Sequence, residues 1–210
     1  MHHYATDSEE RRIVPFLLAG CAVLIAYFIY WATAALHMSI PWWVDVPGPF
    51  LLYGVLYATF DEWVWRWHIL RYARIVVIPD LNGRWVGILR SSFDNYEREH
   101  SIVLQIRQKW TRIVITTRGS TSRSHSTVAA IDMSGIEPVL NYQYVNEPLA
   151  TAVAPMNTHR GTAWLVVKPL ADGPALEGEY YTGRGRATIG QLRFVKGVIE
   201  LHLAEPSNDG

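Results

Sequence analysis

The sequence predicts a membrane-anchored, all-β protein in which two N-terminal transmembrane helices precede an eight-stranded antiparallel barrel. Two observations predict this architecture. Residues 13–60 carry a single formal charge, Asp45, although charged residues make up 18% of the 210-residue chain. After Pro79, the spacing of apolar residues changes from the helical period to the alternation of a half-buried strand. We therefore expect a membrane segment joined to a soluble β domain.

The first predicted membrane span covers residues 13–36, which contain no charged side chain. A helix of this length measures about 36 Å and can cross a hydrocarbon core of about 30 Å. A signal peptide is the alternative, because Arg11 and Arg12 precede the apolar run. The run is longer than a signal-peptide core, and a second apolar segment follows it, so we expect an anchor.

The second predicted span covers residues 49–70, after an outward-facing loop at 37–48. Tryptophans near its two ends are expected to anchor it at the membrane interfaces, since an indole has an apolar body and one N–H donor. These residues are Trp42, Trp43, Trp63, Trp65 and Trp67. Asp61 and Glu62 fall inside the span. They either pair with Arg66 or face a helix interface or water path, because intramembrane acids need partners.

Basic residues near the span ends predict the orientation. The N-terminal tail at 1–12 contains two arginines, and three more (Arg66, Arg71 and Arg74) follow the second span. The connecting loop contains no Lys or Arg. Because basic residues favour the cytoplasmic side, we expect a multi-pass protein with both termini in the cytoplasm.

A linker at 71–80 is expected to lead into the β domain at 81–205. Short β-branched and aromatic runs recur there, separated by Gly, Pro, Asn, Asp and Ser. The predicted strands are 84–91, 101–108, 110–118, 123–132, 137–145, 160–168, 175–182 and 187–195, with a possible short ninth at 198–203. No long amphipathic helix separates them. An up-and-down, lipocalin-like barrel is therefore expected, since closure removes strand edges. A two-sheet sandwich is the alternative.

Strand alternation predicts which side chains face the interior of this barrel, and eight strands leave room there for one small ligand. The predicted inward positions are Trp85, Gly87, Leu89, Ile102, Leu104, Ile106, Leu140, Tyr142, Tyr144, Leu176, Gly178, Tyr180, Gly190, Leu192 and Phe194. An inward phenol needs a hydrogen-bond partner, which a polar ligand would supply. We therefore predict that Tyr142, Tyr144 and Tyr180 contact a ligand. Ordinary core packing is the alternative.

Arginines gather at the turns that an up-and-down meander places at the end of the barrel away from the membrane. Arg is the side chain best suited to bidentate binding of phosphate. The segment Arg118-Gly-Ser-Thr-Ser-Arg-Ser-His125 adds backbone amides and hydroxyls that suit oxyanions. We predict that four arginines join the tyrosines in binding a small phosphorylated ligand: Arg118, Arg123, Arg184 and Arg186. A solvated rim of polar turns is the alternative.

Composition and motifs argue against several other classes. Lys plus Arg and Asp plus Glu both number 19, so the net charge is zero, which argues against DNA or RNA as a partner. The single cysteine, Cys21, forms neither a disulfide framework nor a Cys-based zinc site. No hydrolase, metalloprotease, Walker or dinucleotide motif occurs. We predict no catalytic residue, no cofactor and no metal, although a distal site at His100, His125 and His159 stays open.

The domain order and several local stretches resemble a known family. Pro79-Asp-Leu-Asn-Gly-Arg-Trp-Val-Gly-Ile-Leu-Arg-Ser-Ser92 enters the first predicted strand, and Leu176-Glu-Gly-Glu-Tyr-Tyr-Thr182 and Gly190-Gln-Leu192 lie near the end. The chain resembles the membrane effectors of bacterial CBASS anti-phage systems. These are the SMODS-associated two-transmembrane, β-strand-rich effectors, or CD-NTase-associated protein 15 family.

The resemblance implies a mechanism. A phage-activated nucleotidyltransferase makes a cyclic dinucleotide, and the barrel binds it. The effector then forms a homo-oligomer, and its helices disrupt the bacterial inner membrane, which causes abortive infection. The alternative is a membrane-anchored, lipocalin-like module that binds an apolar ligand without killing. An enzyme is the third hypothesis, for which the sequence offers no nucleophile or metal set.

Overall fold

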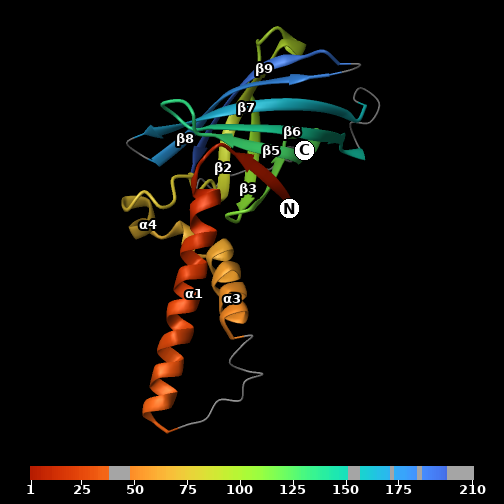
Figure 1. Cartoon of the computed structure of the whole chain (residues 1–210). Coiled ribbons are helices and arrows are strands. Elements are labelled where there is room, and N and C mark those ends of the chain that lie inside the picture. The colour runs from red at the N-terminus through yellow and green to blue at the C-terminus, as the bar shows by residue number, and fades with distance from the viewer. Residues whose placement is uncertain (38–47, 151–156, 171–172, 184–185, 198–210) are drawn as a thin grey trace, which may run out of the picture.

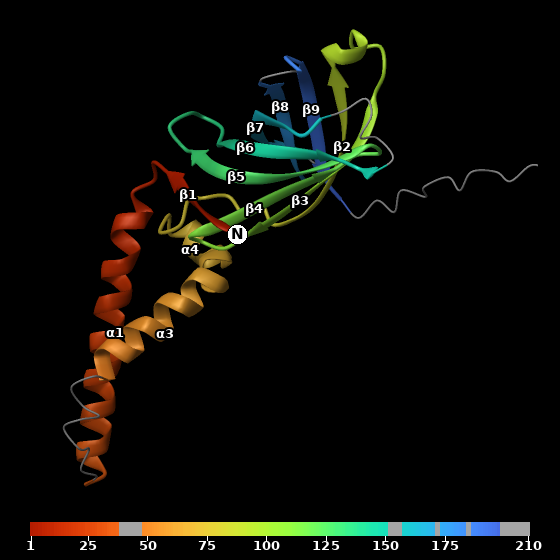
Figure 2. The same cartoon turned by 90° about the vertical axis from the view of Figure 1, so that its right-hand side faces the viewer.

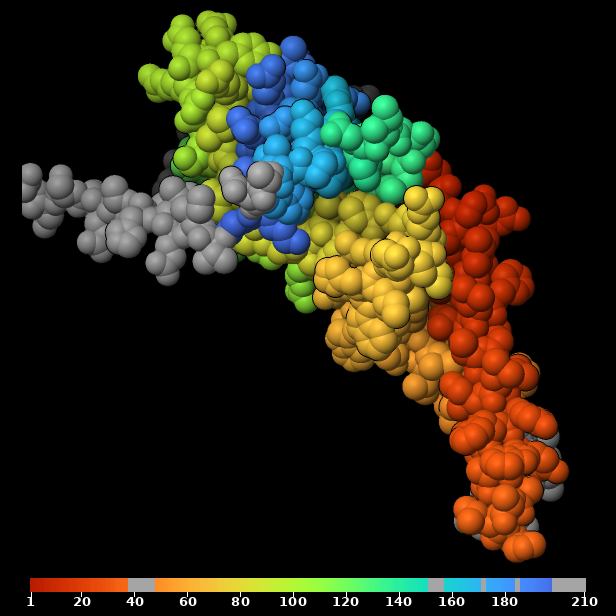
Figure 3. All heavy atoms as spheres, turned by 90° about the vertical axis from the view of Figure 1, so that its left-hand side faces the viewer, coloured from red at the N-terminus to blue at the C-terminus, as the bar shows by residue number. Residues whose placement is uncertain are grey.

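The computed structural model describes residues 1–37, 48–150, 157–170, 173–183 and 186–197. Helices and a barrel form two distinct parts, and the helices meet the barrel at one end (Figure 1). The N-terminal part contains β1 (His2–Thr6), α1 (Glu10–Ala35), α3 (Gly48–Glu62), η1 (Val64–Arg66) and α4 (His68–Tyr72). In space-filling view, the segment around α4 lies between the barrel and the helices (Figure 3).

Eight strands follow in the order that the sequence predicts. They are β2 (Gly83–Ser91), β3 (His100–Gln108), β4 (Arg112–Arg118), β5 (Ser122–Asp132), β6 (Val139–Pro148), β7 (His159–Leu170), β8 (Gly173–Thr182) and β9 (Ile189–Lys196), with a short helix η2 (Ser92–Asp94) after β2. Consecutive strands pair antiparallel, and β9 pairs with β2 to close the barrel. The prediction of a closed meander is confirmed. The predicted short strand at 198–203 lies outside the described residues.

The barrel contains nine strands rather than eight, because the N-terminal tail forms β1. β1 pairs antiparallel with β4 and parallel with β5. Residues 1–12, predicted as a cytoplasmic N-terminal tail, therefore contain a strand of the barrel. Tyr4 explains the insertion, since its side chain is only 7% exposed and belongs to the barrel core. A five-residue strand directly before a membrane helix has too little pattern to be predicted.

The helix α1 covers most of the first predicted span, residues 13–36. Its 26 residues make it the one helix, among those the structure describes, that is long and apolar enough to cross a membrane. Most of its large apolar side chains are exposed, including Phe16, Leu24, Phe28 and Trp31. An apolar surface of this extent is typical of a segment that is surrounded by lipid.

The second predicted span differs from the structure at its C-terminal end. The helix α3 stops at Glu62, and the chain turns through η1 and α4 rather than continuing as one helix to residue 70. The described helix measures about 22 Å at 1.5 Å per residue, shorter than a hydrocarbon core of about 30 Å. Trp65 accounts for the turn, because it is fully buried in a second apolar cluster with Val14 and Trp110. Its predicted place in a membrane belt is wrong.

The two acids at the end of α3, Asp61 and Glu62, bind the barrel. The sequence predicted instead that they pair with Arg66 or face a helix interface or water path. The Asp61 carboxylate accepts hydrogen bonds from Thr111 N at 2.7 Å and Thr111 Oγ1 at 2.8 Å. Glu62 forms an ion pair with Lys109. Arg66 donates to the Glu62 backbone carbonyl at 2.9 Å rather than to a carboxylate. The α3 terminus is therefore attached to the β3–β4 turn.

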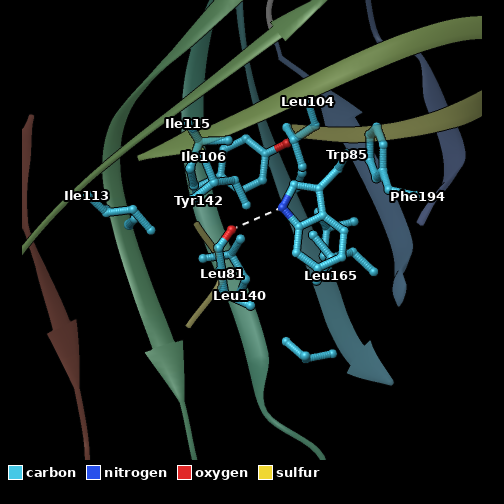
Figure 4. Close-up of a cluster of buried hydrophobic side chains, with 14 of the residues drawn as sticks. Leu81, Trp85, Leu104, Ile106, Ile113, Ile115, Leu140, Tyr142, Leu165 and Phe194 are labelled. Carbon is cyan, nitrogen blue, oxygen red and sulfur yellow. Dashed lines mark hydrogen bonds between the residues drawn. The ribbon is translucent and has the colours of Figure 1, made fainter. Parts of the chain in front are cut away.

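Apolar side chains fill the half of the barrel nearest the helices. Figure 4 shows Trp85 at the centre of this cluster, where its Nε1 donates to the Leu81 carbonyl at 3.0 Å. The predicted inward positions are confirmed for the following buried side chains: Trp85, Ile102, Leu104, Ile106, Leu140, Tyr142, Leu176, Tyr180, Leu192 and Phe194. Because these side chains close the proximal half, the remaining interior space lies at the distal end.

Candidate ligand-binding site

A cavity of about 410 Å³ opens at the distal end of the barrel. Each of the strands β2 to β9 contributes at least one lining residue, as does η2. The volume falls in the range of about 300–1,000 Å³ that is typical of small-molecule sites. The cavity is therefore large enough for a ligand and sits where the distal turns meet.

All three predicted tyrosines line this cavity: Tyr142, Tyr144 and Tyr180. The rings of Tyr142 and Tyr144 lie 6.0 Å apart between centroids. The Tyr180 hydroxyl donates to Ser91 Oγ at 2.8 Å. Burial raises the pKa of Tyr142 to about 12 and also raises the pKa of Tyr144 and Tyr180. All three phenols are therefore neutral at physiological pH.

Two of these rings lie against glycines on the neighbouring strand. Tyr144 is paired with Gly161, and Tyr180 is paired with Gly190. A Cβ atom on Gly161 would lie 2.4 Å from Tyr144 Cζ, and one on Gly190 would lie 2.5 Å from Tyr180 Cε1. Such separations are too short for real atoms. The glycines therefore allow each ring to lie flat on the wall instead of filling the cavity.

Hydroxyl groups form a second part of the lining. The strands β4 and β5 contribute Thr117, Ser122 and Ser124 beside their turn, β8 ends with Thr182, and Thr188 directly precedes β9. The sequence indicated oxyanion-binding groups in residues 118–125, but missed Thr182, Thr188 and Ser91. Each of these three residues lies two positions from a residue that the sequence predicts to face inward. Because alternate residues of a strand share a face, this spacing could have placed them in the lining.

The structure brings one of the predicted arginines to the lining. Arg186 lines the cavity, and its guanidinium carbon lies 5.0 Å from the centroid of the Phe93 ring. Arg118 and Arg123 are exposed and alternate with inward-facing residues, so their side chains lie on the outer face of the barrel, away from the cavity. Arg123 also lies 3.4 Å from Glu147. Arg184 lies outside the described residues. Ligand contact by these three arginines stays a prediction.

Two of the three distal histidines belong to the lining, His100 and His159. His100 Nε2 donates to Asp94 Oδ2 at 2.8 Å, and His159 Nδ1 donates to the Asn157 carbonyl at 2.9 Å. His125 is exposed and does not line the cavity. Within the described part of the chain, no group of three His, Cys, Asp or Glu side chains could hold a metal ion.

The charge of the lining favours an anion. No aspartate or glutamate occurs among the described residues that line the cavity, whereas Arg186, His100 and His159 do. Phenols and hydroxyls supply further donors. The fold and this cavity together define a membrane-attached β-barrel receptor for a small ligand.

Comparison with known families identifies the receptor type. Residues 76–196 match the family model described as "Cap15, cyclic dinucleotide receptor domain", and residues 12–66 match the model described as "Cap15, TM helices". The chain belongs to the Cap15 family. The family resemblance that the sequence indicated is confirmed.

Two curated relatives carry the name CD-NTase-associated protein 15. The protein from Yersinia aleksiciae is 34% identical over 149 residues, which cover 69% of this chain and 67% of the relative. The protein from Staphylococcus schleiferi is 26% identical over 159 residues, which cover 73% of this chain and 80% of the relative. Both alignments extend over most of each chain, so the likeness is not confined to one motif.

Proposed function

We propose that this protein is an anti-phage effector whose barrel binds a cyclic dinucleotide in the distal cavity. Binding drives assembly into a homo-oligomer and disruption of the bacterial inner membrane. The observation that carries the proposal is the lining of the cavity, which combines three tyrosines, a hydroxyl-bearing turn and Arg186 without a described carboxylate. This cavity lies in the domain that matches the cyclic dinucleotide receptor model.

The lining suits the two kinds of group that a cyclic dinucleotide presents. Each of its two bases has a π-face, and tyrosine rings provide stacking surfaces for such faces. Its two phosphates are anions, and an arginine can bind a phosphate through two parallel hydrogen bonds. Thr117, Ser122 and Ser124 supply neutral donors on the β4–β5 side of the cavity.

The membrane part of the proposal rests on α1 and α3. Both helices reach the barrel at the same end, α1 with its N-terminus and α3 with its C-terminus (Figures 1 and 2). This arrangement supports a helical hairpin with both chain termini and the barrel in the cytoplasm. Trp63 and Trp67 are exposed beside the end of α3 and are proposed to anchor it at the interface. Trp42 and Trp43 lie outside the described residues.

Calorimetry on the full chain in nanodiscs tests the ligand site. The ligands are cyclic di-GMP, cyclic di-AMP and cyclic GMP-AMP. Arg186→Gln should weaken the binding of the preferred compound at least tenfold, because a charge-assisted hydrogen bond contributes about 1.5–3 kcal/mol. Arg118→Gln changes an arginine on the outer face, and an affinity equal to that of the wild type would confine the site to the cavity lining.

Three results would contradict parts of this proposal. Equal losses for both arginine variants would move the site to the outer rim. Binding that is unaffected by Arg186→Gln would remove that side chain from the site. A wild-type chain that binds none of the cyclic dinucleotides but takes up a fatty acid would favour the apolar-ligand module.

A further inference from the structure

The strands β4 and β5 form a fork. They pair directly at three positions beside their turn, the last of them Thr116 with His125. Beyond this point β1 lies between them, antiparallel to β4 and parallel to β5 (Figure 2). The gap between the arms of the fork is therefore a binding site for an extended strand, and the N-terminus of the chain fills it.

Specific contacts hold β1 in the fork. Ser126 Oγ accepts a hydrogen bond from Ile115 N at 3.0 Å and lies 2.8 Å from His2 Nε2. Ser126 thus connects both arms of the fork to β1. Further along, Gln108 Nε2 donates to the Tyr4 hydroxyl at 3.3 Å, and the Arg11 guanidinium lies 4.8 Å from the centroid of the Tyr4 ring.

The undivided end of the same fork forms a wall of the ligand cavity. Thr117 and Ser124 are paired directly on the short stem, and the Ser122 carbonyl accepts a hydrogen bond from Gly119 N at the adjoining turn. β3 and β6 pair with the outer edges of this stem, so in the absence of β1 only the three β4–β5 pairs would join the two sides of the sheet here. Without β1, the separated parts of β4 and β5 would each present an unpaired edge. β1 therefore completes the sheet directly beside this cavity wall.

The other end of β1 leads directly into the membrane helix. Only residues 7–9 separate β1 from α1. The Asp7 carboxylate accepts a hydrogen bond from Met133 N at 2.8 Å, which holds this connection against the end of β5. A strand and a short, attached connection thus join the cavity wall to α1.

We propose that β1 is a docking strand that orders the cavity wall and connects it to α1. Resting on the proposed function, the proposal states that cyclic dinucleotide binding and β1 docking stabilise each other. Thermodynamic linkage makes this coupling reciprocal. Binding therefore stiffens the joint between the barrel and α1, and this is the route by which the cavity acts on the membrane segment.

Hydrogen exchange on the full chain tests the first half of the proposal without a ligand. Ala5→Pro removes a backbone N–H from β1 and opposes its docking, whereas the matched control Ala5→Thr keeps the N–H at the same exposed position. Amides in residues 113–126 should exchange at least tenfold faster in Ala5→Pro than in Ala5→Thr. Amides of β7 and β8 should remain protected in both. Unchanged protection at 113–126, in a chain whose β1 has lost protection, overturns the proposal.

A disulfide provides a second test should Ala5→Pro fail to fold. His3 and Arg112 are directly paired and exposed on adjacent antiparallel strands, where the distance between paired residues suits a disulfide. His3→Cys with Arg112→Cys, in a Cys21→Ala chain, should slow exchange at 113–126 when oxidised. Equal exchange in the oxidised and reduced forms contradicts the ordering role.

The coupling is measured with the cyclic dinucleotide that calorimetry identifies. Adding it should slow exchange of the β1 amides, and Ala5→Pro should weaken its binding at least tenfold relative to Ala5→Thr. Wild-type binding without any change in β1 exchange overturns the coupling. Failure of the wild type to bind any cyclic dinucleotide overturns the proposed function instead, and the experiments without ligand still decide whether β1 orders the wall.

Discussion

Tyr144 and Gly161 illustrate how single residues shape the cavity. The Tyr144 ring lies over Gly161 on the neighbouring strand, and a Cβ there would also approach the Tyr181 carbonyl to 2.7 Å. Only a glycine at this position lets the Tyr144 ring lie this close to the neighbouring backbone. The inward direction of Tyr144 follows from strand alternation, whereas the need for a glycine opposite it depends on the register between β6 and β7.

Gly161→Ala should push the Tyr144 ring into the cavity. Overpacking of this kind costs about 1–3 kcal/mol of stability, so the melting temperature should fall and cyclic dinucleotide binding should weaken. Thermal unfolding and calorimetry on the full chain measure both effects. Gly135→Ala is the matched control, because the nearest atom to its added Cβ is the Glu137 carbonyl oxygen at 3.5 Å. Wild-type affinity in Gly161→Ala would show that the Tyr144 position does not define the site.

At the scale of elements, the junction between α1 and the barrel is a network of hydrogen bonds around Glu10. Its buried carboxylate accepts from Val77 N at 2.6 Å, Ile78 N at 3.1 Å and Trp110 Nε1 at 2.6 Å. One side chain thus joins the start of α1, the segment before β2 and the β3–β4 turn. The predicted linker at 71–80 is therefore partly fixed to the helix.

Glu10→Ala should loosen this junction, because it leaves three donors without their acceptor, and two of them, Ile78 N and Trp110 Nε1, are buried. Leaving a buried donor unsatisfied costs about 1–3 kcal/mol, so amide exchange at Val77 and Ile78 should accelerate and the melting temperature should fall. The neighbouring substitution Glu9→Ala removes an exposed carboxylate that pairs only with Arg12 in the structure and should have little effect. Similar exchange rates in the two variants would argue against a structural role for Glu10.

At the scale of the whole molecule, the one described helix that is long and apolar enough to cross a membrane carries the lone cysteine. Cys21 lies within α1 and is exposed in the structure. If α1 crosses the bilayer, lipid covers this thiol, so a membrane-impermeant maleimide should not label it in sealed vesicles. The same reagent should label it after unfolding in detergent.

A second cysteine reports the orientation of the barrel. Ile136→Cys, in a Cys21→Ala chain, places a thiol on the fully exposed β5–β6 turn. In inverted inner-membrane vesicles, where the cytoplasmic face is outside, this thiol should react without detergent. Labelling of Cys21 in intact vesicles would be incompatible with a spanning α1, and protection of the thiol at position 136 would place the barrel on the other side.

The sequence by itself determined the features that depend on local patterns. A long run without charge predicts α1 because the bilayer excludes charged groups. Alternation predicts eight strands and the inward tyrosines because successive side chains point to opposite faces. Alternation also indicates that Arg123 points away from the cavity, because it lies between Ser122 and Ser124, which face inward. Arg186 lies before β9, where alternation gives no direction.

Only the tertiary structure decided the features that depend on partners far apart in the chain. β1 has five residues and becomes a strand because Ile113 and Ala129 offer it backbone partners across the gap in the barrel. The helix α3 ends at Glu62 because Trp65 is buried near Trp110 and Asp61 binds Thr111. Such contacts outweigh the weak preferences of a short segment, because helix and strand stability in proteins comes largely from tertiary packing.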